Sequence, residues 1–245
     1  MKRIMTIIIA SVFAIAVSAS LGAEELHAVV GQVSPQGIDA FTKLFTAIAE
    51  ATGNTVKIEV VPTARALYLV ANGQADFCGP VTASKDPKKI ATLDYAYSTL
   101  VTHETALVLY TNKNKDIAVD DLKKGNKAQY SIETSVSMVD LFPFVMQPST
   151  STDGSFKKLD ANRIDGYIYA QAAADAVLKN LGLKTIKRTY FDTSQGVLAI
   201  AKGGKGGKID LLLSKGVDIL KANGKYAVIM SDLLGGGGKY SDWQP

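Results

Sequence analysis

The sequence predicts an α/β protein of two lobes, and three observations carry this expectation. After residue 26, strand-like runs alternate with amphipathic helical segments in a β-α-β-α-β order, which is typical of a parallel sheet with helical crossovers. The same alternation starts again in the middle third of the chain. The 245 residues are 47% hydrophobic and 20% charged, an ordinary globular composition with enough apolar material for a folded core.

The first residues have the three parts of a Sec-type signal peptide. Two basic residues near the start are followed by an apolar run over 4–17 and then by small residues. The run is shorter than the ~20 apolar residues of a membrane-spanning helix, which disfavours an uncleaved anchor. Cleavage is expected after Ala19 or Ala23. We therefore assign residues 1–23 to a signal peptide and the mature protein to the periplasm.

Charge and cysteine content narrow the expected partners. The net charge of +4 falls to about +2 once the signal peptide is removed, which is too small to indicate a nucleic-acid partner. The single cysteine, Cys78, lies in an apolar run and is expected to be buried without a disulfide. The absence of a cysteine near the cleavage region argues against a lipid anchor and fits a Gram-negative periplasm.

The first elements follow from apolar periodicity and from helix start and stop residues. Ser34-Pro35 opens a helix, because serine caps helix N-termini and proline fits the first turn. Gly53 ends that helix. The other elements expected before the middle of the chain are strands over 27–32, 56–61 and 77–81 and a helix over 65–72.

The second half of the chain repeats the alternation. Thr134 and Ser135 are expected to start a helix that reaches Met146, and residues 147–155 to form a loop. We expect a mobile tail from residue 235. The remaining expected elements are extended runs over 93–96, 104–111, 128–132, 165–169, 185–190 and 197–201 and helices over 119–122, 172–179, 209–220 and 226–233.

Common catalytic and metal-binding motifs do not occur in the sequence. The chain has only two histidines, His27 and His103, so a histidine-rich metal site is excluded. It contains neither GxSxG nor GxxxxGK[ST]. The glycine- and lysine-rich stretch 203–208 lacks the Ser or Thr of a phosphate loop and is interpreted as a strand-to-helix turn. We expect no metal and no cofactor.

Five short segments resemble one protein family, in the same order along the chain. They are ARAL with VANGQAD (64–76), DPKK with LDY (86–95), DDLKKG (120–125), LDANRIDGY (159–167) and LKANGKY (220–226). They are distributed across nearly the whole mature chain. They resemble the family 3 extracellular solute-binding proteins of ABC importers, the polar amino-acid binding type.

This resemblance implies a two-lobed periplasmic-binding-protein fold of the second type. We expect two separate sheets, each mostly parallel and flanked by helices, joined by crossings near 109–112 and 192–196. Lobe 1 is expected to contain residues 24–109 and 196–245, and lobe 2 residues 110–195. The resemblance also implies a small-molecule solute as ligand and an ABC permease of the inner membrane as partner, and we expect a monomer that binds no nucleic acid.

Several side chains are candidates to line a cleft between the lobes. Thr82 and Ser84 follow the third strand and offer hydroxyls at the sheet edge, where open α/β sheets bind ligands. Thr134 and Ser135 are expected at a helix N-terminus, whose free amides favour an anionic group. Arg65 either pairs with an acid in the cleft or forms a surface salt bridge.

The resemblance adds further candidates. The family's carboxylate-binding arginine corresponds to Lys88 or Lys89, of which one contacts the ligand or both are solvated. Tyr169 and Gln171 occupy the stretch where the family places an amine-binding acid, and either face the cleft or pack internally. Thr63 stands where the family often has an aromatic residue.

We therefore expect a receptor that closes on a small polar solute with a carboxylate or another anionic group, and not an enzyme. An ordinary α-amino acid fits less well, because no acidic partner for its amine is evident. One alternative is a lyase- or dehydratase-like periplasmic enzyme on the same fold, with Glu133 as the only nearby carboxylate. The other is a solute-sensing module that contacts a signalling partner.

Overall fold

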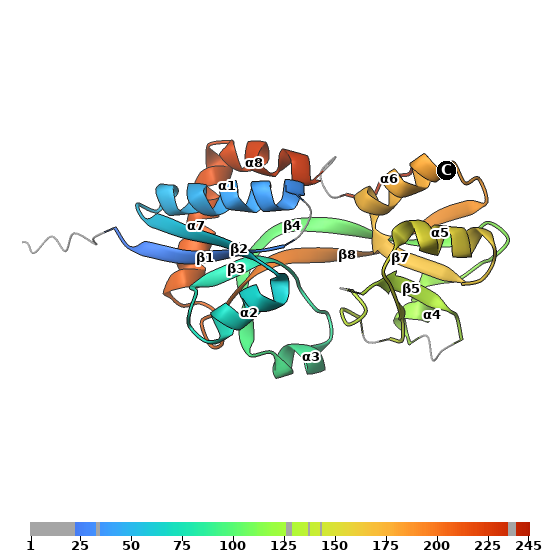
Figure 1. The fold of residues 1–245 in the computed structure, drawn as a ribbon, viewed down its shortest axis with the longest axis horizontal. Helices are drawn as coiled ribbons and strands as arrows, with labels where there is room; N and C mark the ends of the chain where they lie inside the picture. The colour runs from blue at the N-terminus through green and yellow to red at the C-terminus, as the bar shows by residue number, and fades with distance from the viewer. Residues whose placement is uncertain (1–22, 33–34, 126–128, 137, 143, 235–238) are drawn as a thin grey trace, which may run out of the picture.

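The computed structural model describes residues 23–32, 35–125, 129–136, 138–142, 144–234 and 239–245. They form an elongated molecule of two lobes (Figure 1). Two long antiparallel strands, β4 (Tyr95–Asn112) and β8 (Ile186–Ala201), run through both lobes. The expected signal peptide falls almost wholly outside the described residues, as does the glycine run 235–238. None of the described helices is long and apolar enough to cross a bilayer.

The eight strands form one hydrogen-bonded sheet, in the order β2-β1-β3-β8-β4-β7-β5-β6. The expectation of two separate sheets was therefore wrong. The runs 93–96 and 104–111 both contribute to β4, and 185–190 and 197–201 both belong to β8. The polar residues between these runs stay extended because the two strands pair with each other across the gap, which satisfies their backbone hydrogen bonds.

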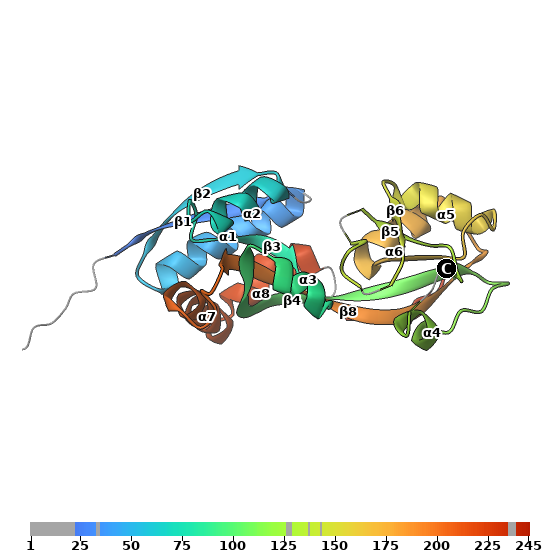
Figure 2. The same cartoon turned by 90° about the horizontal axis from the view of Figure 1, so that it is seen from below.

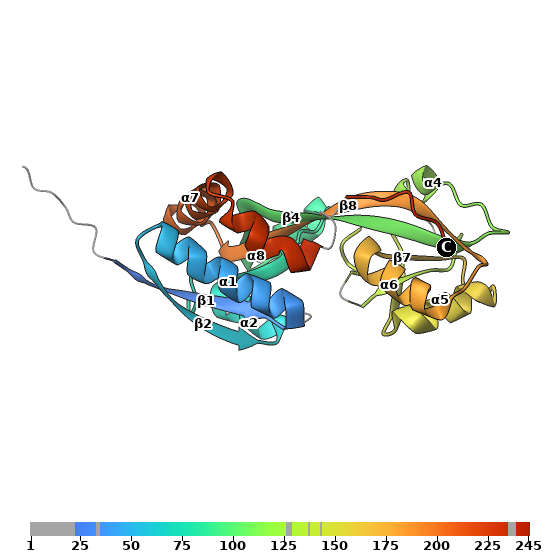
Figure 3. The same ribbon diagram turned by 90° about the horizontal axis from the view of Figure 1, so that it is seen from above.

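Lobe 1 places three parallel strands beside the start of β4 and the end of β8. Successive residues of a strand face opposite sides of the sheet: Ala28 and Val30 pack toward α1, α7 and α8, whereas Val29 packs toward α2. Figure 3 shows α1 and α8 along one side of the sheet. The bounds are β1 (Glu25–Gly31), α1 (Pro35–Ala51), β2 (Thr55–Val61), α2 (Thr63–Ala71), β3 (Phe77–Thr82), α3 (Pro87–Thr92), α7 (Lys208–Ala222) and α8 (Lys225–Leu234).

Lobe 2 is built the same way on the other ends of β4 and β8. Leu107 and Leu109 of β4 face one hydrophobic cluster, and Val108 and Tyr110 face the cluster under α5 and α6. Strands β5, β6 and β7 are parallel to one another. The bounds are α4 (Val119–Lys123), β5 (Ile132–Ser135), β6 (Gln147–Ser149), α5 (Thr152–Asp160), β7 (Gly166–Ala170) and α6 (Gln171–Leu181).

The expected helix from Thr134 to Met146 does not exist among the described residues. Thr134 and Ser135 end strand β5. Residue 128 of the expected strand over 128–132 lies outside the described residues, and of the others only Ile132 belongs to β5. Turns, bends and irregular backbone follow among the described residues up to Met146. The sequence has a proline at position 143, which removes a helical hydrogen bond and disfavours helical backbone before it. Five of its apolar side chains are instead buried in one cluster with Phe191: Met138, Leu141, Phe142, Phe144 and Met146. The expected loop over 147–155 contains β6 and the start of α5.

Each hydrophobic cluster lies within one lobe. On the two long strands, the clusters of lobe 1 reach Val101 of β4 and Val197 of β8, and those of lobe 2 reach Leu107 of β4 and Phe191 of β8. Lobe 1 is therefore defined here as residues 23–101 and 197–234, and lobe 2 as 107–191. The crossing on β4 precedes the expected 109–112, because Leu107 and Leu109 already pair with β7.

The C-terminal tail, residues 239–245, differs from its expected place in lobe 1. Its aromatic residues Tyr240 and Trp243 pack on the α6 side of lobe 2, and the chain ends there (Figure 1). The tail is counted below as part of lobe 2.

Candidate functional site

A cavity of about 770 Å³ lies between the lobes, at the carboxyl ends of β1, β3 and β7. This is the position at which open α/β sheets bind ligands. Figure 2 shows the two lobes on either side of the strands that join them. Lobe 1 provides Gln32, Thr63, Leu67, Pro80, Val81, Thr82, Ser84, Lys89, Thr92, Leu93, Tyr95 and Tyr97, and lobe 2 provides Asp140, Leu141 and Tyr169.

Five of the predicted site residues line this cavity together: Thr63, Thr82, Ser84, Lys89 and Tyr169. Their positions follow from local structure. The threonines begin α2 and end β3. Lys89 is carried by α3, a short helix with a proline in its first turn, whose Asp86 N-cap accepts a hydrogen bond from the backbone at position 88 at 2.9 Å.

Four predicted residues are not in the cavity lining. Arg65 is exposed, and its guanidinium lies over the ring of Tyr68 at 5.6 Å. Thr134 is fully buried and its hydroxyl donates to the Ile168 carbonyl at 2.7 Å. Ser135 pairs with β6 at the end of β5. Gln171 binds the C-terminal tail (below). The helix N-terminus expected to attract an anion is thus replaced by a strand end.

Two tyrosines of β4 were missed by sequence reasoning. Tyr95 and Tyr97 are two residues apart and therefore lie on the same face of the strand. Their ring centroids are 5.8 Å apart, and both side chains line the cavity. The Tyr97 hydroxyl accepts a hydrogen bond from the Ser84 amide at 3.2 Å. Burial raises the pKa of Tyr95 above its ordinary value, so this phenol stays neutral. The sequence pattern that could have revealed them is Tyr-Ala-Tyr, because every second residue of a strand faces the same side of the sheet.

Asp140 is a second residue that the sequence did not reveal. It forms an ion pair with Lys89 of the opposite lobe, and the Lys85 amide donates to the Leu141 carbonyl at 3.1 Å. The side chains of Lys89 and Asp140 are 39% and 81% exposed, so the pair is worth only about 0.2–1 kcal/mol. An incoming charged group can therefore replace either partner at little cost.

Glu133, the carboxylate proposed for the enzyme alternative, is already engaged. It is buried on β5, where it accepts hydrogen bonds from the Ser155 hydroxyl and the Lys158 ammonium, both at 2.7 Å. It does not line the cavity. Among the described residues, no group of three or more His, Cys, Asp or Glu side chains could hold a metal ion.

Two other features noted in the sequence serve the fold of lobe 1. Cys78 is buried in the α2 cluster, and burial raises the pKa of its thiol to about 12. The glycine-rich stretch 203–208 is a turn before α7. There, buried Asp210 accepts hydrogen bonds from the amides of Gly206 at 2.7 Å and Thr99 at 2.8 Å, so the turn binds a carboxylate of its own chain.

The hinge between the lobes contains a close contact around a glycine. Gly196 of β8 faces His103 of β4, and a Cβ at position 196 would lie 2.0 Å from the imidazole ring. The Thr102 hydroxyl donates to the Gly196 carbonyl at 2.9 Å. Burial lowers the pKa of His103, so its ring is neutral at pH 7.

Comparisons with known proteins identify solved structures that share this architecture. No family model and no curated protein sequence matches the chain. A substrate-binding protein of an amino acid ABC transporter superimposes with a TM-score of 0.54 at 16% identity, covering 85% of this chain and 98% of that one. An ancestral arginine-binding protein bound to arginine gives 0.55 at 18% identity, with coverages of 85% and 97%.

A histidine kinase sensor domain with similarity to periplasmic binding proteins gives a TM-score of 0.57 at 15% identity, covering 87% of this chain and 97% of that one. These similarities confirm the two-lobed periplasmic-binding-protein fold of the second type. The resemblance found in the sequence is thereby confirmed at the level of the fold.

Proposed function

We propose that the protein is a periplasmic solute-binding receptor that captures a small polar solute by lobe closure and delivers it to an ABC importer. The observation that carries this proposal is the cavity lined from both lobes beside a hinge of two strands. A solute in this cavity contacts both lobes only when they are closed, so binding shifts the population toward the closed state. The similarity to the substrate-binding protein of an amino acid ABC transporter supports the role.

We further propose that the solute carries a carboxylate or another anionic group that contacts Lys89. Lys89 is the only cationic side chain among the described residues that line the cavity. Its present partner Asp140 is largely exposed, so an anionic group of the solute can displace it. A solute that also carries a cationic group can use Asp140 as its acceptor.

The receptor role is favoured over the enzyme alternative. Catalysis of elimination or hydration needs an acid or base at the substrate, and Glu133 is held by Ser155 and Lys158 outside the cavity lining. The similarity to a histidine kinase sensor domain keeps solute sensing as a second candidate role. Capture of a permease or of a signalling protein by the solute-loaded receptor distinguishes the two.

The test begins with mass spectrometry of whatever solute co-purifies and is released by gentle denaturation. Calorimetry then compares the affinity of Lys89→Met with that of Lys88→Met, a matched control because Lys88 is exposed outside the cavity lining. We expect a loss of about 10- to 100-fold for the first variant, since a hydrogen bond to a charged group contributes about 1.5–3 kcal/mol, and no loss for the second.

Two results would count against these proposals separately. Equal affinities of the two lysine variants, or tight binding of a cationic solute only, contradict the anionic ligand and leave the receptor role standing. Turnover of the bound solute contradicts the receptor role itself.

A further inference from the structure

The C-terminal tail makes a third connection between the lobes, in addition to the two hinge strands. Helix α8 packs in lobe 1, where Met230 is fully buried against the core beside α1 and α7. The tail that follows it in the sequence, residues 239–245, packs on lobe 2. The chain therefore leaves lobe 1 after α8 and is anchored again on the opposite lobe. The last turn of α8 and the first turn of α6 face each other beside the hinge (Figures 1 and 3).

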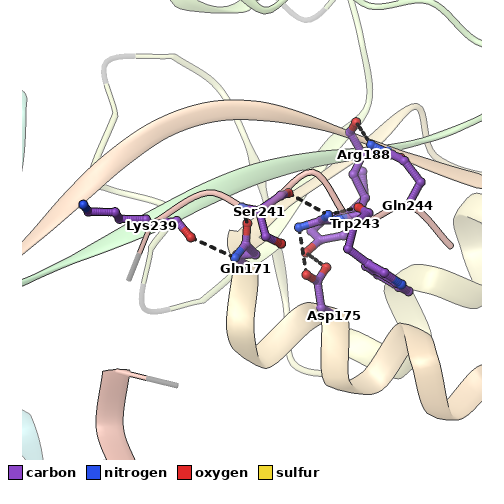
Figure 4. Close-up of polar contacts among 8 residues, drawn as sticks. Gln171, Asp175, Arg188, Lys239, Ser241, Trp243 and Gln244 are labelled. Carbon is purple, nitrogen blue, oxygen red and sulfur yellow. Dashed lines mark hydrogen bonds and ion pairs between the residues drawn. The ribbon is translucent and has the colours of Figure 1, made fainter. Parts of the chain in front are cut away.

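A buried arginine, Arg188, holds the tail in place. Arg188 of β8 has a fully buried side chain and forms an ion pair with Asp175 of α6 at 2.7 Å. Its guanidinium also donates to the carbonyls of Ser241, at 3.1 Å, and Trp243. Figure 4 shows the guanidinium between α6 and the tail. Charge-assisted hydrogen bonds of this kind are about twice as strong as neutral ones.

Aromatic contacts add to this anchor. Two cations lie over the Trp243 ring, Lys179 at 4.5 Å and Arg188 at 5.2 Å from its centroid. Tyr240 packs on Tyr190 with ring centroids 5.5 Å apart. Each cation–π contact contributes about 0.5–1 kcal/mol at an exposed site and more where water is excluded.

Side-chain amides pair with backbone at both ends of the tail. Gln171, at the start of α6, donates to the Lys239 carbonyl at 3.1 Å and accepts from the Ser241 amide at 2.8 Å. Gln244 accepts from the Arg188 amide at 3.2 Å and donates to the Arg188 carbonyl at 3.3 Å. The anchor at Gln171 is two residues from Tyr169, which lines the cavity.

The covalent distance between the two anchored parts is short. Five residue steps join Leu234, the last residue of α8, to Lys239. A chain of that length spans at most about 18 Å, so the ends of α8 and of the tail cannot separate further while both stay packed.

We propose that the docked tail is a third inter-lobe strap that restricts how far the lobes move about the β4–β8 hinge. The proposal concerns the range of hinge motion and does not depend on which solute binds. Its mechanism is purely geometric: the strap limits separation on its side of the hinge as long as the contacts of Arg188 and Trp243 hold the tail.

The test measures inter-lobe distances in the full mature chain without solute. Spin labels are placed at Lys215→Cys in lobe 1 and Lys184→Cys in lobe 2, both exposed, and the distance distribution is recorded by double electron–electron resonance. The native Cys78 is buried with a raised thiol pKa, so it should not be labelled. The decisive variant inserts ten Gly/Ser residues after Gly236, which lengthens the connection by roughly 35 Å of reach and leaves every anchor residue in place.

We expect the insertion to broaden the distance distribution into separations absent from the unmodified chain. Trp243 is the only tryptophan, so an unchanged emission spectrum verifies that the tail is still docked. As a control, Tyr240→Ala with Trp243→Ala removes the aromatic anchors, so the tail should leave lobe 2 and the distance distribution should broaden. The insertion should not broaden it further in this variant, because the tail no longer connects the lobes. Identical distributions with the short and the long connection, with Trp243 docked in both, would overturn the proposal. Because no solute is present, a failure of the proposed function does not affect this outcome.

Discussion

The two lobes share one construction but contribute unequally to the cavity. Lobe 1 provides twelve of the described lining residues and lobe 2 provides three. Most of the lobe 1 residues come from α2, β3, α3, β4 and the segments beside them, whereas Asp140, Leu141 and Tyr169 come from a turn and one strand end. In the proposed function, lobe 1 is therefore the platform for the solute and lobe 2 is its cover.

The largest effect on stability is expected from truncating one buried phenylalanine in the core of either lobe. Phe45 is fully buried in lobe 1 and Phe156 in lobe 2. Phe45→Ala and Phe156→Ala should each lower the free energy of unfolding by about 3–5 kcal/mol. Because no hydrophobic cluster formed by the described residues crosses the hinge, hydrogen exchange should accelerate mainly in the lobe that carries the substitution. Equal acceleration in both lobes after either change would show that they unfold as one unit.

A smaller effect, on the dissociation rate of the solute, is expected when lobe 2 loses Tyr169. Tyr169→Ala removes a lobe 2 contact that forms only on closure, so it should raise the dissociation rate of the solute about 10-fold and leave the association rate nearly unchanged. Stopped-flow measurements with the co-purifying solute check this. Tyr68→Ala is the control, since Tyr68 is 53% exposed and outside this lining. A tenfold loss in the association rate of Tyr169→Ala would mean that lobe 2 takes part in the first encounter.

At the hinge between the two lobes, Gly196→Ala should destabilise the protein by about 1–3 kcal/mol, a typical cost of overpacking. The added methyl group meets the His103 ring and forces it to move. Denaturant unfolding measures the loss. The double variant with His103→Ala should recover most of it, and a double variant no more stable than Gly196→Ala alone would place the strain elsewhere.

The smallest expected effect is the pH dependence that His103 confers. Burial holds the pKa of this imidazole below its ordinary value of 6.5. As the pH falls below 6.5, the unfolded chain therefore takes up the proton before the folded one, and stability is lost. Well above pH 6.5 the contribution is constant, because the imidazole is then neutral in both states. His103→Gln should show a flatter stability profile between pH 7 and pH 5 than the unmodified protein, and parallel profiles would contradict this role.

Lobe 1 was predictable from the sequence because its signals are local and consistent. Pro35 and Gly53 bracket α1, and the apolar run Ala28-Val29-Val30 matches the two buried faces of β1. The segment before Met146 in lobe 2 was not predictable in this way. Its apolar residues have helical spacing, but a proline and burial against Phe191 favour turns.

The candidate site was predictable only where it follows strand ends and helix starts. Thr82 and Ser84 line the cavity for that reason, whereas Thr63, Lys89 and Tyr169 were expected from the family resemblance. Asp140 lies in the turn that was expected to be a helix, so its contact with Lys89 of the other lobe had no local signal. The same holds for Gln171, whose partners are about 70 residues away in the C-terminal tail.

The most direct test of lobe closure is small-angle X-ray scattering of the solute-free protein before and after the co-purifying solute is added back. The account predicts a smaller radius of gyration with the solute, because the platform and the cover approach each other around β4 and β8. An unchanged scattering curve under conditions where calorimetry shows full occupancy would contradict it.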